Sequence, residues 1–314
     1  MQVRFLHPLE NGFNRMKTAL FKPFDLGKWF VVGFTAFLAH LSGGSAGRGG
    51  GSKYANPADK GDWDIGNIVD APDTVIHWLQ EHTGYAILIL FGIILVIGII
   101  ILLTWLSSRG KFMFLHNVAG NRSEVTKPWH EYAREGNSVL FWSLGFGLIC
   151  FLIMVGFGVA VYNLLCRIDA EGLVFLDIAP EIVGLGLLLL LYMLVTAYVL
   201  LFLNDFIVPV MYRNRISAIK AWQRFMKIFA GHPLQFLFYG LIIVIIYMLI
   251  GALYITAGVF TCCIGFIFLV LPYISSVVTL PVSYTLRAFS AEFLAQFGGE
   301  FNVFKTAGKE KKRT

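Results

Sequence analysis

The stretch YAILILFGIILVIGIIILLTWL, residues 85–106, decides the fold class of this chain. It carries no charged side chain from its first residue to its last. A helix needs about 20 predominantly apolar residues to cross the hydrocarbon core of a bilayer. The stretch is therefore predicted to be a transmembrane helix, and the chain is predicted to be an all-α polytopic membrane bundle.

The composition of the whole chain agrees with this class. Of the 314 residues, 57% are hydrophobic and 14% are charged, whereas soluble domains have about 25% charged residues. Residues 1–314 are predicted to form a single integral membrane domain with an outer loop at 43–84 and a basic cytoplasmic tail at 287–314. The six predicted transmembrane helices cover residues 29–42, 85–106, 138–165, 182–210, 233–258 and 264–286.

The lysines and arginines predict the orientation. If the N-terminus is cytoplasmic, the inner segments are 1–28, 107–137, 211–233 and 287–314. These segments hold 5, 5, 5 and 6 lysines and arginines, which is 21 of the 25 in the chain. Cytoplasmic loops are enriched in lysine and arginine, so both termini are predicted to be cytoplasmic. The same distribution explains the basic character of the chain without any nucleic acid.

The segment RNRISAIKAWQRFMKIFAGHPLQF, residues 213–236, predicts an interfacial amphipathic helix beside the fourth span. Bulky apolar residues recur at three- and four-residue steps, which places them on one helical face; they are Ile216, Ile219, Trp222, Phe225, Ile228 and Phe229. Lys220, Arg224 and Lys227 lie elsewhere around the helix. Such a helix buries its apolar face among acyl chains and turns its cations toward anionic headgroups. It either only anchors the bundle or recognises specific lipids or partners.

An internal repeat is predicted from matching segments. WHEYAREGNSVLFWSLG (129–145) precedes the third span much as WQRFMKIFAGHPLQFLFYG (222–240) precedes the fifth, so Trp129 is the counterpart of Trp222. Span four ends in PVMYRNR from Pro209, and span six ends in PVSYTLR from Pro281. We therefore expect three units, each an interfacial helix followed by a helical hairpin, with each proline kinking its outgoing helix.

Alternating amphipathic helices and hairpins with Pro-x-x-Tyr exits resemble poorly characterised bacterial six-span inner-membrane families. These families are similar to the membrane domain attached to some glycerophosphodiester phosphodiesterases. The resemblance implies a bacterial inner-membrane location. It carries over no active site, because the carboxylate and histidine constellation of the soluble phosphodiesterase domain is absent from this sequence.

One polar pair is predicted inside a span, at Asn204 and Asp205 in LFLNDFIVPV. Intramembrane acids are costly and often functional. Arg213 and Arg215 follow, so a structural ion pair or a cap for a helix kinked at Pro209 is the simpler interpretation, and proton or ion coupling is the alternative. Pro272 and Pro281 interrupt span six in a way that transporters also use.

No catalytic set, metal site or cofactor motif is predicted from the sequence. Cys166 could pair with Cys262 or Cys263 near the outer face. We therefore expect a non-enzymatic membrane subunit or scaffold that engages anionic lipid headgroups, protein partners or a second copy of itself at the cytoplasmic leaflet. The alternative is a transporter or channel for a small or amphipathic solute, for which a polar cavity around Asn204, Asp205 and Pro272 would be the discriminating feature.

Overall fold

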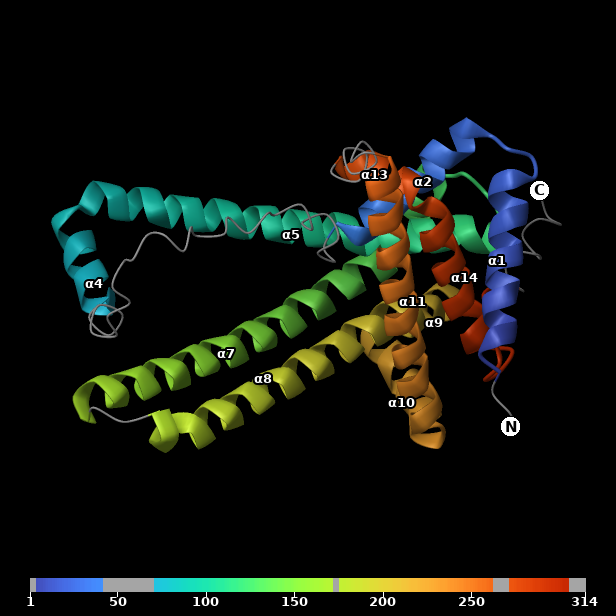
Figure 1. The fold of residues 1–314 in the computed structure, drawn as a ribbon. Coiled ribbons are helices and arrows are strands. Elements are labelled where there is room, and N and C mark those ends of the chain that lie inside the picture. The colour runs from blue at the N-terminus through green and yellow to red at the C-terminus, as the bar shows by residue number, and fades with distance from the viewer. Residues whose placement is uncertain (1–3, 42–70, 172–174, 262–270, 305–314) are drawn as a thin grey trace. The chain divides into compact units, whose positions relative to one another are not determined.

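The structure is a computed structural model that describes residues 4–41, 71–171, 175–261 and 271–304, and these residues are predominantly helical (Figure 1). The predicted all-α class is confirmed for them. The elements, in chain order, are α1 (Leu6–Phe21), α2 (Leu26–His40), α4 (Ala71–Glu81), α5 (Thr83–Gly120), α6 (Thr126–Glu131), α7 (Ala133–Glu171), α8 (Phe175–Phe202), the π-helical turn η2 (Leu203–Ile207), α9 (Val208–Asn214), α10 (Ala218–Gly231), α11 (Pro233–Phe260), α13 (Pro272–Val278) and α14 (Leu280–Ala295).

Four helical stretches in the described residues are long and apolar enough to cross a membrane. They are Thr83–Gly120, Ala133–Ala170, Ile178–Asn214 and Pro233–Phe260, and the shortest has 28 residues. At about 1.5 Å of rise per residue, each exceeds the roughly 30 Å of the hydrocarbon core. These four correspond to the second to fifth predicted spans, and they support a membrane protein.

In the part of the chain that the structure describes, the first and sixth predicted spans do not correspond to helices that are long enough to cross a membrane. α2 has 15 residues, or about 22 Å of helix, and several of its residues are buried within protein. The sixth span falls partly on residues 262–270, which lie outside the described residues, as do Cys262 and Cys263. The described part is α13 and the start of α14. Six spans therefore stay a prediction.

The chain divides into two compact units, and α5, α7 and α8 each contribute residues to both. The second unit comprises residues 50–102 and 144–197. Within it, the hydroxyl of Tyr192 on α8 donates a hydrogen bond of 3.1 Å to the backbone carbonyl of Cys150 on α7. None of the residues in the most apolar stretch of α5 or α7 is buried. Water would solvate so much exposed apolar surface poorly, whereas lipid would cover it.

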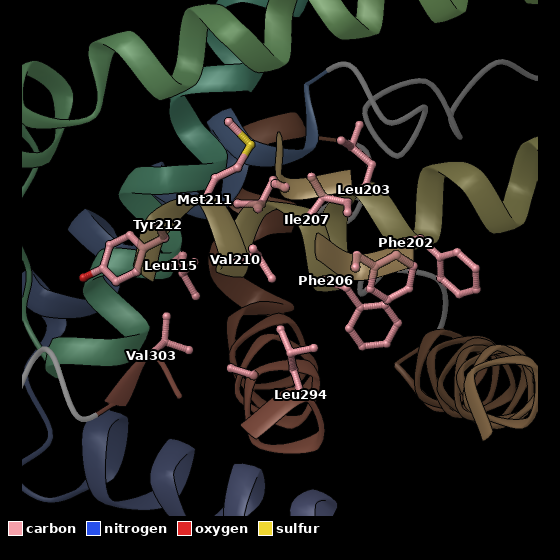
Figure 2. Packing of buried hydrophobic residues seen from close by; sticks show 14 of the residues in the cluster. Leu115, Phe202, Leu203, Phe206, Ile207, Val210, Met211, Tyr212, Leu294 and Val303 are labelled. Carbon is pink, nitrogen blue, oxygen red and sulfur yellow. The ribbon is translucent and has the colours of Figure 1, made fainter. Parts of the chain in front are cut away.

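The first unit comprises residues 1–49, 103–143 and 198–314, and its described part has a packed aromatic core. Phe206 of η2 contacts Phe225 of α10 and Phe236 of α11, with ring centroids 5.3 and 5.1 Å apart. Figure 2 shows part of this cluster, with Phe202 and Phe206 beside Ile207 and Val210 of the same chain segment. Stacked and edge-to-face aromatic pairs of this kind stabilise cores beyond the area that they bury.

The predicted tail at 287–314 begins as part of this core. α14 continues to Ala295, and its Phe289, Phe293 and Leu294 are buried. α1 packs closely along α14, because a side chain at Gly12 would lie 3.0 Å from the backbone of Thr285 and Phe289. α14, which includes the first residues of the predicted tail, therefore packs against the N-terminal helix, and the basic segment 305–314 lies outside the described residues.

Candidate functional site

α10 is fixed to the first unit by one of its faces. Its residues Ala218, Ala221 and Phe225 are buried, and the backbone amide of Ala218 donates to the hydroxyl of Ser138 on α7 at 2.9 Å. Arg215, which ends α9 in a left-handed conformation with φ 54°, turns the chain into this helix. The stripe that we expected among acyl chains is thus partly a protein contact.

The two tryptophans of the predicted lipid site also contact protein. Trp222 of α10 stacks on Trp142 of α7, with ring centroids 5.4 Å apart. Trp129 of α6 makes an edge-on contact with Trp105 of α5 at 5.5 Å, and the guanidinium of Arg109 lies 4.9 Å from the Trp129 ring. The side chains of Trp129 and Trp222 are both half-buried. Their contacts fix α6 to α5 and α10 to α7.

The other face of α10 forms a continuous surface, which we call the α10 surface. It consists of Ile219, Lys220, Gln223, Arg224, Met226 and Lys227, and a hollow of about 700 Å³ lies along it. Ile219 and Met226 are 66% and 48% exposed. In the described part of the chain, no carboxylate lies within ion-pair distance of the three cations. Cations beside exposed apolar side chains match an anionic membrane surface.

Asn204 and Asp205 are half-buried and belong to a group that we call the η2 cluster, which also contains the buried Tyr239 and Arg287. The hydroxyl of Tyr239 on α11 donates to Oδ2 of Asp205 at 2.9 Å. The guanidinium of Arg287 on α14 donates to the backbone carbonyl of Asn204. π-helical turns such as η2 leave backbone groups without their usual helical partners, and Arg287 satisfies one of these carbonyls.

The negative charge of Asp205 favours the charged form of the nearby Arg287 guanidinium. Burial lowers the pKa of the Arg287 guanidinium, and the nearby Asp205 and Tyr239 act in the opposite direction. Lys111 of α5 also lies close enough for its charge to repel that of Arg287. A buried charge is costly unless a partner compensates it. Asp205 lies near enough to Arg287 for its negative charge to offset part of that cost.

Arg215, which the sequence suggested as an ion-pair partner of Asp205, binds other acidic residues. Its guanidinium bonds to Glu131, lies 3.8 Å from Glu135 Oε1 and lies 3.8 Å above the ring of Tyr132. Arg213 is half-buried in the last turn of α9. The acids of α6 and α7, rather than Asp205, are the partners of Arg215.

Pro272 and Pro281 lie at the starts of α13 and α14, where proline is favoured because the first amides of a helix have no intrahelical acceptor. Pro209 is buried directly after the π-helical turn η2, inside the continuous helical stretch Ile178–Asn214. Among the described residues, the hollow along α10 and the cavity beside α1 are both lined without Asn204, Asp205 or Pro272.

Sequence reasoning missed Tyr239, Arg287 and Glu131. Arg287 is the last residue of the second Pro-Val-x-Tyr-x-x-Arg motif. The repetition of this motif singled out Arg287, but it did not predict a contact with η2. Tyr239 lies in an apolar run, where its hydroxyl was the one available signal, because a buried tyrosine hydroxyl usually finds a partner.

A family model matches residues 6–303, which is nearly all of the described chain. The chain belongs to DUF7544, a family of unknown function. The match covers both compact units and includes the α10 surface and the η2 cluster. No curated protein and no solved structure matches the chain. The expected membership of a family without an assigned function is thus confirmed, whereas the resemblance to the phosphodiesterase-associated membrane domain stays a prediction.

Proposed function

We propose that this DUF7544 chain is a non-enzymatic membrane protein that binds anionic lipid headgroups through the α10 surface. In this proposal it lies in a bacterial inner membrane with six spans and both termini in the cytoplasm, and it serves as a membrane subunit or scaffold. The single observation that carries the proposal is that Lys220, Arg224 and Lys227 lie beside the exposed Ile219 and Met226 on one helix face.

The energetics of such a surface are favourable. Each cation near an anionic leaflet contributes about 1 kcal/mol, so three cations on one face favour anionic over neutral lipid substantially. Because Phe225 and Trp222 already hold α10 to the protein, the helix does not have to fold or reorient when it meets the lipid. A preorganised surface loses less conformational entropy on binding than a flexible one does.

Extraction into a lipid-preserving polymer, followed by mass spectrometry of the bound lipids and proteins, tests this proposal. We expect anionic lipids to be enriched over the bulk membrane and the enrichment to be lost in Lys220→Gln/Arg224→Gln/Lys227→Gln. The control triple Lys17→Gln/Lys22→Gln/Arg134→Gln removes equal charge from other exposed positions. A protein that carries lipid in the bulk ratio contradicts the proposal, and a stoichiometric protein partner lost only in the α10 triple favours a protein scaffold.

A transporter or channel is the second candidate, and the π-helical turn at Leu203–Ile207 favours it, since π-turns inside helices frequently occur at functional sites. Against it, Asp205 is already bonded to Tyr239 and compensates Arg287. Solute flux into reconstituted vesicles that depends on Asp205, and that Asp205→Asn abolishes in a folded protein, would replace the first proposal with this one.

A further inference from the structure

An open, polar cavity of about 490 Å³ lies at the surface of the first unit, and no residue of α10 lines it. Its volume falls in the range of small-ligand sites, which is about 300–1,000 Å³. We call it the α1 cavity. Asn11, Asn14, Arg15 and Thr18 line it from one face of α1, and the remaining lining residues are Val118, Ala119, Asn121, Tyr284 and Glu292. The spacing of the α1 residues follows the three- and four-residue steps of a single helix face.

The charges that line the α1 cavity cancel. The guanidinium of Arg15 donates to Glu292 Oε1 at 2.7 Å, and the same guanidinium lies 3.7 Å from the centre of the Phe304 ring. Among the residues that the structure describes, no other fully charged side chain lines the cavity. Because the one cation and the one anion are paired with each other, the lining of the cavity carries no net charge.

The other polar groups combine donors with acceptors. Three carboxamides, those of Asn11, Asn14 and Asn121, line the cavity, and a carboxamide carries an NH₂ donor and a carbonyl acceptor. The NH₂ group of Asn11 lies 3.3 Å from Nδ1 of His7, which leaves its carbonyl as the free acceptor. Asn121 uses its carbonyl for Lys28 Nζ, which donates at 2.7 Å, so its NH₂ group is left to donate. In the described part of the chain, the side chain of Asn14 has no hydrogen-bond partner. The Thr18 hydroxyl donates to the backbone carbonyl of Asn14 at 2.9 Å, so its oxygen can still accept a hydrogen bond.

An apolar part of the lining completes the cavity. Val118 and Ala119 from the end of α5 contribute to it with Tyr284 of α14, whose hydroxyl donates to the backbone carbonyl of Val118 at 3.1 Å. All three residues are buried, so they present only a small apolar area to the cavity. A ligand that suits this lining has several hydroxyls that both donate and accept, carries no net charge and has C–H surface for the apolar part. These are the properties of a sugar or polyol.

We infer that the α1 cavity binds a neutral polyhydroxyl group, either a free sugar or the sugar headgroup of a glycolipid. Carboxamides of α1 and Asn121 bond its hydroxyls, while Val118, Ala119 and Tyr284 cover its C–H surface. The inference is independent of the α10 surface, because no residue is shared between the two cavities.

Saturation-transfer NMR of the full chain in detergent, with D-glucose as the probe, tests this inference. A second arm measures retention of a glucosyl diacylglycerol by native mass spectrometry in phosphatidylcholine nanodiscs. We expect a signal in at least one arm, reduced at least fivefold in Asn14→Leu/Thr18→Val. A signal from glucose identifies a free sugar as sufficient, and a signal confined to the glycolipid identifies the headgroup.

Two further variants keep the test decisive. Lys17→Gln, an exposed position of the same helix that does not line the cavity, should keep the wild-type signal. Arg15→Gln/Glu292→Gln removes both charges together and should bind the sugar within about twofold of wild type. The inference is overturned if neither arm gives a signal, if Asn14→Leu/Thr18→Val binds like wild type in a folded protein, or if glucose 6-phosphate binds better than glucose and depends on Arg15.

Discussion

Trp222 of α10 stacks on Trp142 of α7, with ring planes 21° apart and centroids 5.4 Å apart. This contact joins α10, within the first unit, to a helix that is long and apolar enough to cross a membrane. Offset aromatic stacking contributes about 0.5–1.5 kcal/mol beyond the buried area. α10 is therefore held on one face by protein, which leaves its cations and two exposed apolar side chains for the surroundings.

Substitutions on the two faces of α10 should have different effects on the stability of the protein. Phe225→Ala removes a fully buried ring that contacts Phe202 and Phe206, and we expect a loss of about 3–5 kcal/mol of stability. Ile219→Ala, at a position 66% exposed, should leave stability within about 0.5 kcal/mol. Unfolding followed by near-ultraviolet circular dichroism in detergent measures both. Equal losses from the two changes would show that the α10 surface is also buried.

The η2 cluster predicts a specific effect of a single hydroxyl. Tyr239→Phe removes the hydrogen bond to Asp205 and leaves the ring, so we expect about 1.5–3 kcal/mol of destabilisation, as for hydrogen bonds to charged groups. Tyr247→Phe is the matched control, because Tyr247 lies on the same helix and is 54% exposed. Thermal unfolding of the two variants should differ clearly, and indistinguishable midpoints would show that the hydrogen bond between Tyr239 and Asp205 adds no stability.

Gly110 of α5 should tolerate no side chain. A Cβ there would lie 2.5 Å from the Leu38 carbonyl carbon and 2.6 Å from the Ala39 nitrogen of α2. Gly110→Ala should therefore cost about 1–3 kcal/mol through overpacking. At Gly92, on the same helix, a Cβ would meet no atom of a neighbouring described residue within 4 Å, so Gly92→Ala should be neutral or slightly stabilising. Unfolding midpoints in a detergent series measure the difference, and a stable Gly110→Ala would contradict the close packing of α2 on α5.

The long apolar helices could be predicted from sequence because crossing a membrane is a local requirement on length and polarity. Residues 85–106 meet it without reference to any other part of the chain. α2 could not be assigned this way, since its 15 residues are partly buried against protein. Apolar periodicity reports that a face is covered, but not whether lipid or protein covers it, which is why Phe225 was expected among acyl chains.

The candidate sites were predictable only where the residues were close in sequence. The cations of the α10 surface follow from the wheel of one helix, whereas Arg287 reaches Asn204 only through the tertiary fold. The two Pro-Val-x-Tyr exits do share a role. The Tyr212 hydroxyl lies 3.2 Å from Nδ1 of His116, and Tyr284 donates to the Val118 carbonyl, so both hydroxyls contact the last turns of α5.

Hydrogen exchange of residues 218–231 in nanodiscs, measured by mass spectrometry, shows directly whether the α10 surface meets anionic lipid. We expect slower exchange in α10 when phosphatidylglycerol replaces part of the phosphatidylcholine. The slowing should be absent in Lys220→Gln/Arg224→Gln/Lys227→Gln and should weaken with added salt, which screens exposed charges. Equal exchange of α10 in neutral and anionic nanodiscs would contradict the proposal that this surface binds anionic lipid.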